Sequence, residues 1–350
     1  MESTICWRLL KRICCRMSKS KDIIMDKNER IIAVDTARAY LIMLVIIGHV
    51  LIVINRSYSI LLLNCIQEFI YSFHMAAFFI IHGTLISNDR WSNTYYQDFL
   101  RKKIMTIAVP YLFFECIGTV WESIFLGQSL ITGLWNMLTI QCNVGADWFL
   151  PALFFGDCLV FLYIKIKKKG LGIITIILAI VILMATPKSL FFTAIGRGIM
   201  AYIFIMIGLL GKSIVLSEKT GEWYIIIGSF LVTVCCAIIN LEFAGNDFYS
   251  ITLGNPCTFL IAGICGTCMI FGISRRFSLK MTEIVGQHTL TIMGTHQLII
   301  YAFIAFVGRE IYDGSIYYGF ALLVMVIVIE IPLVYLVDKY LYFLVGKTQK

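Results

Sequence analysis

Arg38 and His49 are the residues of this sequence whose types and spacing most clearly suggest chemistry. Both lie inside the apolar stretch 31–54. Eleven helical steps of about 100° bring them to the same face of one helix, roughly 16 Å apart along its axis. Asp35 precedes Arg38 by three residues, within reach of an intrahelical ion pair. Because ionisable groups in a membrane span are costly and usually face a cavity or a partner, the pair predicts a polar track into the membrane.

These side chains suit different parts of a group-transfer reaction. A guanidinium about 10 Å from the start of the span could bind a phosphate through paired hydrogen bonds. An imidazole titrates near the operating pH, so His49 could act as a general base or carry the transferred group covalently, and the sequence leaves both routes open. The structural alternatives are an ion pair of Arg38 with Asp35 and simple packing of His49 against another helix.

The composition predicts an all-α polytopic membrane protein. The chain has 350 residues, of which 59% are hydrophobic and only 14% charged. Apolar runs of spanning length recur throughout. We expect about ten transmembrane helices, at 31–54, 66–86, 104–126, 148–165, 171–186, 196–211, 223–240, 254–274, 284–307 and 315–338. The 12 cysteines mostly lie within apolar runs, and no metal site is expected.

The distribution of Lys and Arg predicts the orientation of the chain. Residues 1–30 form a basic tail expected to be cytoplasmic, and residues 31–345 form the transmembrane domain. Only Arg56, Lys188, Arg197 and Arg309 fall on the opposite side of the membrane, and Arg38 is left within a span, so both termini should be cytoplasmic. Residues 91–103 are expected to form an interfacial helix, and residues 130–141 another on the outer face.

Read in order, the polar landmarks resemble those of the acyltransferase-3 family of integral-membrane O-acyltransferases. The match rests on AVDTARAYLIMLVIIGH (Asp35, Arg38, His49), FHMAAFFIIHG, the basic cluster before Pro110-Tyr111, Trp148 to Pro151, Gly254-Asn255-Pro256 and His296. It covers about residues 30 to 340. Two departures, Ala76 in place of proline and His82 in place of serine, lead us to expect an altered acceptor side.

The resemblance implies an O-acyltransferase of the cell membrane. It would move an acyl group, most often acetyl, from cytoplasmic acetyl-CoA or another acyl-CoA to a hydroxyl of a cell-surface polysaccharide or its lipid-linked precursor. Catalysis is assigned to His49, Arg38 and Asp35. Phosphates of the donor would be held by Arg38 and by Arg101, Lys102 and Lys103, which also suit a role as topology determinants. Acceptor binding is assigned to His74, Glu115, Trp148 and His296.

Two other classes of function remain open. A transporter or flippase of a polar solute or lipid-linked sugar would also use glycine-interrupted helices, although no internal repeat is evident. A membrane sensing or scaffold module is the third alternative. Membrane lipid is the expected surrounding partner, nucleic acid is not expected, and assembly into a homo-oligomer is left open. Arg197 could contact an anionic acceptor or anchor the chain.

Overall fold

The structure is a computed structural model that describes residues 27–55, 60–166, 171–185, 190–243, 245–307 and 315–346. Most of the basic tail 1–30, together with Arg56, Lys188 and Arg309, lies outside the described residues. In the described part, helices account for nearly all regular structure, and the only strands form a two-residue antiparallel pair, β1 (Asn246–Asp247) with β2 (Thr252–Leu253). The expected all-α fold is confirmed.

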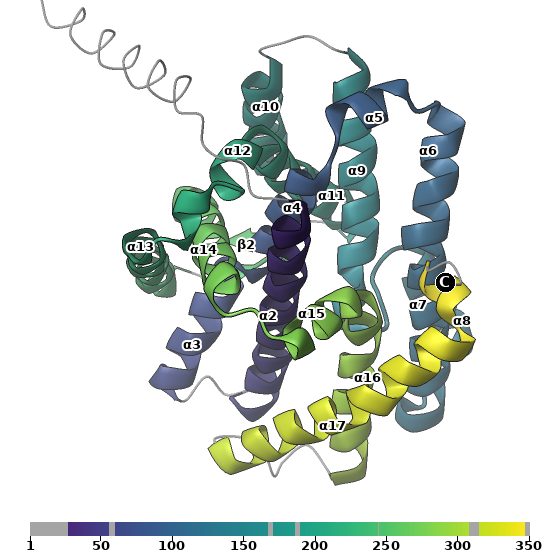
Figure 1. Cartoon of the computed structure of the whole chain (residues 1–350). Helices are drawn as coiled ribbons and strands as arrows, with labels where there is room; N and C mark the ends of the chain where they lie inside the picture. The colour runs from purple at the N-terminus through teal and green to yellow at the C-terminus, as the bar shows by residue number, and fades with distance from the viewer. Residues whose placement is uncertain are drawn as a thin grey trace, which may run out of the picture.

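Nine helical segments of the described chain are long and apolar enough to cross a membrane. A further apolar helix, α10 (Leu171–Ala185), has 15 residues and corresponds to the fifth predicted span. The spanning helices that run without a break are α2 (Lys27–Ile54), α9 (Phe149–Ile166), α11 (Leu190–Leu210), α13 (Trp223–Leu241), α14 (Pro256–Arg276) and α17 (Ile316–Tyr340). Figure 1 shows them as one bundle around α2, while shorter helices, α12 (Lys212–Val215) and η3 (Glu218–Gly221), connect α11 to α13.

The second span is broken in its middle, into α3 (Leu61–Tyr71) and α4 (His74–Leu85). Ser72 and Phe73 form the break, with Phe73 at φ −143°, outside the helical region. The Ser72 hydroxyl donates to the carbonyl of Phe69 (2.8 Å), which satisfies one backbone acceptor there. At the break the Ile70 carbonyl accepts from the backbone N–H of Phe73 (3.3 Å), three residues on, and His74 begins a new helix.

The segment expected to lie along the interface is instead mostly continuous with the third span. After the short helix α5 (Asn88–Asn93), α6 (Tyr96–Lys103) passes through a π turn (Ile104–Ala108) into α7 (Val109–Leu126). Pro110 lacks an N–H and cannot bond to the turn before it, which accounts for the wide turn at this place. The chain therefore continues as one column of 31 residues. The predicted outer-face helix is present as α8 (Leu130–Leu138).

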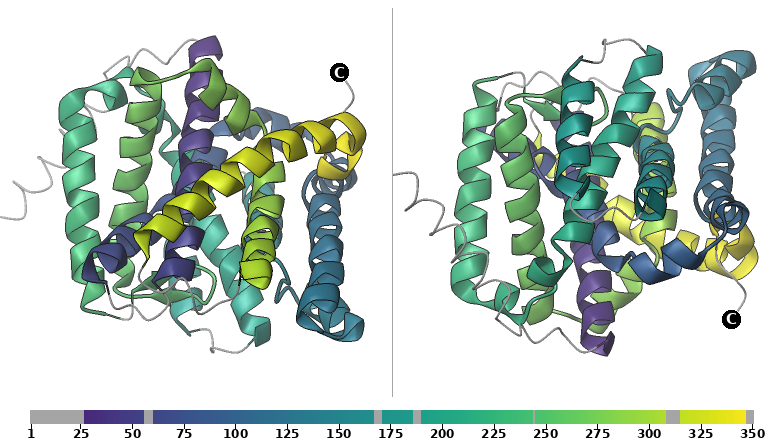
Figure 2. Two further views of the ribbon diagram at one scale, coloured as in Figure 1. Left: turned by 90° about the horizontal axis from the view of Figure 1, so that it is seen from below. Right: turned by 90° about the horizontal axis from the view of Figure 1, so that it is seen from above.

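The predicted span 284–307 is likewise two helices, α15 (Lys280–Gln287) and α16 (Thr289–Val307), separated at His288. His288 Nδ1 pairs with a carboxylate oxygen of Asp338 on α17 (2.5 Å). α17 runs obliquely across α2 and α16, as both views of Figure 2 show. The chain ends, in the described part, with a short 3₁₀ turn, η4 (Tyr342–Val345), which packs on α7.

Small residues let two central helices touch through their backbones. A Cβ added to Gly83 of α4 would lie 2.1 Å from the carbonyl oxygen of Ile205, and one added to Gly208 of α11 would lie 2.0 Å from that of Ile80. Such reciprocal close approach is the packing mode of helices in a lipid environment, where apolar burial alone gives little driving force. α4 is thereby fixed against α11, which in turn lies against α9.

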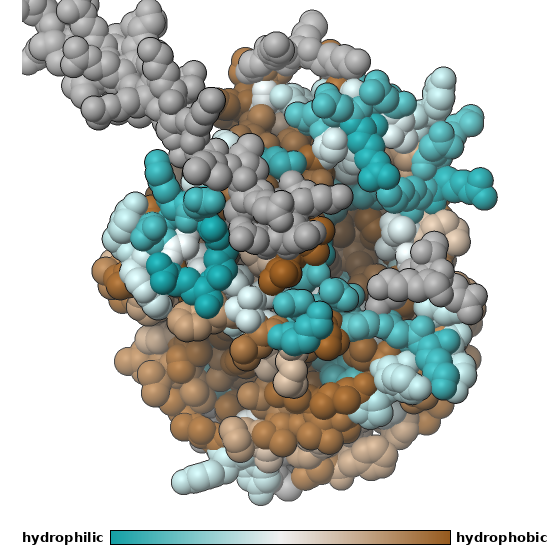
Figure 3. Space-filling view, in the orientation of Figure 1, coloured by the Kyte–Doolittle hydropathy of each residue, from teal (hydrophilic) through white to brown (hydrophobic). Residues whose placement is uncertain are grey.

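The surface matches a chain that meets lipid over much of its height. Large apolar side chains are exposed along α10, α13 and α17, including Ile173, Leu231 and Ile331. Figure 3 shows hydrophobic residues over the lower part of one face and hydrophilic residues gathered above, around α5 and α6 and near the top of α13 and α14. In a soluble protein this much exposed apolar surface would be unusual, whereas in a bilayer it faces the acyl chains.

Candidate active site

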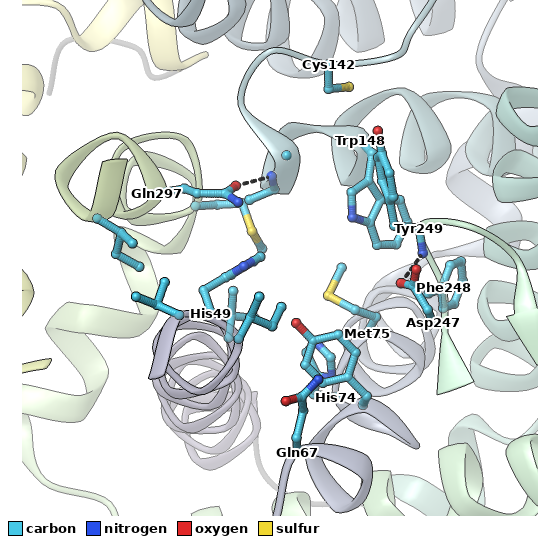
Figure 4. A pocket seen from close by; sticks show the side chains of 18 of the residues that line it. His49, Gln67, His74, Met75, Cys142, Trp148, Asp247, Phe248, Tyr249 and Gln297 are labelled. Carbon is cyan, nitrogen blue, oxygen red and sulfur yellow. Dashed lines mark hydrogen bonds between the residues drawn. The ribbon is translucent and has the colours of Figure 1, made fainter. Parts of the chain in front are cut away.

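A cavity of about 680 Å³ lies at one end of the bundle, beside the C-terminal half of α2. Its walls come from α2, the broken α3–α4 span, α7, α16, the loop after α8 and the hairpin β1–β2. Figure 4 shows His49 on one side of the cavity and Trp148, Phe248 and Tyr249 across from it. The residues used below to describe this wall are His49, Gln67, Glu68, His74, Glu122, Cys142, Asn143, Trp148, Asn246, Asp247, Phe248, Tyr249 and Gln297.

His49 stands beside a second histidine. The imidazole rings of His49 and His296 have centroids 5.2 Å apart, and the planes are inclined by 47°. Nδ1 of His296 bonds to the carbonyl of Ile292, one helical turn earlier (2.7 Å), and must donate this bond because a carbonyl only accepts. Nε2 of His296 is buried and has no hydrogen-bond partner in the described part of the chain. It is therefore an unused acceptor next to His49.

His74 is oriented by the break in the second span. Its Nδ1 donates to the Ile70 carbonyl (2.7 Å), which also accepts from the Phe73 backbone at the break. Its ring meets the edge of Tyr71, with centroids 5.1 Å apart, and both residues line the cavity. The local backbone irregularity thus sets both the position and the tautomer of this histidine, leaving Nε2 as its basic nitrogen.

The loop between α8 and η2 (Gly145–Trp148) carries the opposite wall and is held by a buried carboxylate. Glu115 accepts hydrogen bonds from the backbone N–H groups of Asn143 (2.7 Å) and Val144 (3.1 Å), and from the Asn143 amide. Its side chain is fully buried. Glu115 does not line the cavity, so it is not placed to bind an acceptor there, as the sequence had suggested. It holds the loop that brings Asn143 and Trp148 to the cavity.

The second loop of the wall is the hairpin after α13, held by Glu68. The Glu68 carboxylate accepts from the backbone N–H of Asn246 (3.1 Å) and from its side-chain amide (2.7 Å). Asp247 in turn accepts from the backbone N–H groups of Tyr249 (3.0 Å) and Ser250 (3.2 Å). The Glu68 contacts tie the hairpin to α3, which lies far from it in the sequence.

Arg197 links the two loops and does not present its charge to the cavity. Its guanidinium donates to the carbonyls of Tyr249 (2.7 Å) and Ile140 (3.0 Å) and lies over the Tyr249 ring, 4.0 Å from the centroid. Only 2% of Arg197 is exposed. Ile140 adopts φ +59°, a strained conformation for a β-branched residue, so the arginine stabilises a bend that the chain would otherwise avoid. The idea that Arg197 contacts an anionic acceptor does not fit this geometry.

Trp148 and Phe248 form an aromatic platform where the two loops meet. Their rings stack with centroids 5.0 Å apart and an angle of 25° between planes. Both line the cavity. Gln297 completes this corner by accepting a hydrogen bond from the backbone N–H of Ala146 (2.5 Å), as Figure 4 shows.

Arg38 lies away from the cavity, in a charged cluster of its own. Its guanidinium is 3.6 Å from the Asp35 carboxylate, and 31% of its side chain is exposed. Gln287 also donates to Asp35 (3.3 Å). This contact depends on Gly286, where a Cβ would lie 1.8 Å from the Asp35 carbonyl oxygen, so α15 presses directly on α2.

The predicted polar track between Arg38 and His49 is closed. Three residues lie between them on the same face of α2: Leu41 and Ile42, both 0% exposed, and Val45, 3% exposed. We call these three residues the apolar plug. The sequence placed the two ionisable side chains on one face correctly, but the intervening positions are apolar and are filled by packing against neighbouring helices. The prediction of a continuous track was therefore wrong for this conformation.

The basic cluster of α6 is also separate from the cavity. Arg101 and Lys102 are exposed, while Lys103 pairs with the buried carboxylate of Asp157 (2.5 Å). His82 contacts the other oxygen of Asp157 (2.8 Å). His82 therefore belongs to this ion cluster, and Ala76 is buried against other helices. Neither lines the cavity, so the expectation that these two departures reshape the acceptor side was wrong.

Most residues of the polar wall are not distinguished by the sequence alone. Glu68, Asn246, Asp247 and Gln297 were not singled out, because three belong to connections or helix ends that only tertiary contacts bring to His49. Gln297 could have been found as the residue following His296. The acidic Glu122, which lines the cavity, was visible as an ionisable group within a span.

The fold and the cavity together define a polytopic membrane protein with a histidine-containing polar site buried within its helices, the arrangement of an enzyme that works inside the membrane domain. A family profile described as an acyltransferase domain matches residues 31–335. The chain belongs to this family, the acyltransferase-3 family, and is a membrane acyltransferase. No curated protein and no solved structure matches the chain.

Proposed function

We propose that this protein transfers an acyl group from acyl-CoA, with acetyl-CoA as the proposed donor, to a hydroxyl of an extracytoplasmic glycan or of its lipid-linked precursor. The observation that carries the proposal is the placement of His49, beside His296, on the wall of a cavity otherwise lined by amide, carboxylate and aromatic side chains. These are the groups that bind sugar hydroxyls and sugar ring faces.

His49 acts as the general base of the transfer. It takes the proton from the acceptor hydroxyl while the hydroxyl oxygen forms a bond to the thioester carbonyl carbon. The carbon–sulfur bond then breaks, the thiolate of CoA leaves, and the imidazolium returns the proton to it. His296 is fully buried beside His49 and does not line the cavity itself, so its unpartnered Nε2 is positioned to receive a hydrogen bond from His49. A covalent acyl-histidine route uses the same side chains.

Arg38 serves the donor at the other end of the span. A guanidinium that is partly exposed and held in place by Asp35 suits a phosphate of CoA. His49 is three helical turns away, roughly 16 Å, a distance that the extended arm of the donor can cover. This assignment requires the apolar plug to move aside when the donor binds, while Arg101 and Lys102 remain available to further phosphates. With both termini cytoplasmic, the donor would enter from the cytoplasm of the cell and the cavity would face outward.

The proposal is tested by acyl transfer in membranes. Wild type, His49→Ala and His288→Gln are expressed to equal membrane levels, and acyl esters on isolated surface glycan are measured together with CoA release. His288 is a matched control because it pairs with Asp338 away from the cavity. Esters with wild type and His288→Gln, and none with His49→Ala, support the proposal. Equal ester content in all three contradicts the role of His49.

A transporter or flippase is the alternative function. It would also need a polar cavity, but it would move its solute without consuming acyl-CoA. Transport of a lipid-linked sugar that persists in His49→Ala vesicles, with no CoA release from wild type, would favour that alternative.

A further inference from the structure

The charged side chains that line the cavity are all acidic. Glu68, Glu122 and Asp247 belong to the wall, and no Lys or Arg of the described residues does. Arg197, the nearest candidate, is turned into the protein to bind two carbonyls and the Tyr249 ring. A ligand with negative charge would therefore meet acidic side chains without a compensating Lys or Arg, which disfavours its binding.

The wall also offers hydrogen-bond acceptors that have no donor. Glu122 Oε2, Gln67 Oε1 and Asn246 Oδ1 are buried and lack partners in the part of the chain that the structure describes. The orientation of Asn246 is fixed, because its amide nitrogen donates to Glu68 (2.7 Å) and leaves the oxygen free. Asn246 is only 5% exposed. Buried acceptors without partners are costly, so the cavity favours a ligand rich in donors.

An aromatic surface lies close to these acceptors. Trp148 and Phe248 stack at the junction of the two loops, and Tyr249 adjoins them in the wall. Aromatic faces suit the apolar C–H face of a pyranose ring, while the ring's hydroxyls donate to surrounding oxygens. Phosphate, sulfate and carboxylate groups accept hydrogen bonds and do not donate them when ionised.

We infer that the acceptor of this enzyme is a polyhydroxyl sugar unit without an anionic group near the reacting hydroxyl. A neutral or amine-bearing sugar is therefore acylated. A uronate or a phosphorylated sugar is excluded. This inference deepens the proposed function and rests on it. Three features of the cavity together indicate this class of substrate: the unpartnered hydrogen-bond acceptor oxygens, the acidic wall and the aromatic platform.

The test compares two acceptors that differ in one group. Purified full-length protein in nanodiscs is given cellotriose or the trimer of glucuronic acid with the same linkage. Binding is measured by saturation-transfer NMR, and transfer by CoA release with acetyl-CoA. The expected result is binding of cellotriose at least about tenfold tighter than the glucuronate trimer. Equal binding, or tighter binding of the glucuronate trimer, overturns the inference.

Charge-reversal variants show whether the cavity sets this preference. Glu122→Lys is expected to shift the binding ratio about tenfold toward the glucuronate trimer, and Glu122→Gln to shift it less. Glu242→Lys is the matched control, because Glu242 is exposed at the end of α13 and does not line the cavity. It should leave the ratio unchanged. If the ratio is the same in all variants, the assignment of acceptor class to this wall is wrong.

The two readouts separate this inference from the proposed function. Preferential binding of cellotriose without CoA release would retain the acceptor class and contradict acyl transfer to it. CoA release with the glucuronate trimer alone would retain acyl transfer and overturn the acceptor class.

Discussion

At the His49 end of α2, side chains from five other parts of the chain surround an open cavity, whereas at the Arg38 end the neighbouring helix presses so closely that only glycine fits at position 286. The cavity end offers many hydrogen-bond acceptors and no described Lys or Arg. The Arg38 end offers one partly exposed cation held by one carboxylate. The apolar plug separates the two environments. On the proposed function, this division would keep an anionic donor at one end of α2 and an uncharged acceptor at the other.

The largest effect is expected at the cavity end. His49→Gln should lower kcat by about 10³-fold, within the range of a general base, while the KM for acyl-CoA stays close to that of wild type. Steady-state CoA release at varied acyl-CoA concentration measures both constants. A variant whose KM rises while kcat is retained would place His49 in donor binding and remove the difference between the two ends.

A large effect on donor binding is expected at the other end. Arg38→Ala should raise the KM for acyl-CoA by about tenfold or more, and Arg38→Lys should raise it less, because a lysine keeps the charge but loses the paired hydrogen bonds. Acyl-pantetheine, which lacks the phosphates, is the matched donor. With it, wild type and Arg38→Ala should react equally, and a persisting difference would mean that Arg38 does not bind phosphate.

The apolar plug should control access between the two ends. Val45→Ala is expected to raise CoA release in the absence of acceptor several-fold, because a smaller side chain admits water to the region between donor and His49. Val160→Ala, an equal truncation at a fully buried position of α9, is the control. The role of the plug is contradicted if the two variants release CoA at the same rate.

A moderate effect is expected from the residue that holds the acceptor wall. Glu115→Gln removes the charge that accepts from the Asn143 and Val144 backbone, at a cost of about 2 kcal/mol in the free energy of unfolding. The KM for acceptor should rise and that for acyl-CoA should not. Thermal unfolding in detergent and acceptor kinetics check the two effects. If Glu115 instead contacted the acceptor, activity would fall with no change in stability.

The smallest effect is expected at Cys142, the one thiol among the described residues that line the cavity. Burial raises the pKa of this thiol well above its usual range, so it stays protonated at neutral pH and is a poor nucleophile. Cys142→Ala should therefore change kcat by less than about twofold. A loss comparable to that of His49→Gln would point to an acyl-cysteine intermediate.

Spans and site were predictable from the sequence to different degrees. Helix length and apolar runs located the membrane segments, because every backbone group in lipid must be paired within a helix. The breaks at Ser72–Phe73 and His288 were not predicted, since no proline marks either of them and the glycine near the second, Gly286, was not read as a helix end. They arise from tertiary contacts such as the pairing of His288 with Asp338.

His49 could be singled out because an imidazole in a membrane span is costly and therefore informative. The walls around it could not, because Asn143, Trp148 and Asn246 come from loops whose positions depend on buried carboxylates elsewhere. Glu115 itself was identified as an unusual acid, but sequence could not reveal that its oxygens are occupied by backbone N–H groups. The same types of residue bind substrates and hold loops in place, so residue type alone does not distinguish the two roles.

The apolar plug has a consequence for the membrane as well as for the reaction. A water-filled column joining the two faces would let ions move down the membrane potential, which is worth about 2.3 kcal/mol per charge for each 100 mV. Leu41 and Ile42 are fully buried on this face of α2, and Val45 is 3% exposed at the cavity wall, so apolar side chains separate the two ends. The protein can therefore keep a polar cavity at one end and a partly exposed arginine at the other without a polar column joining them.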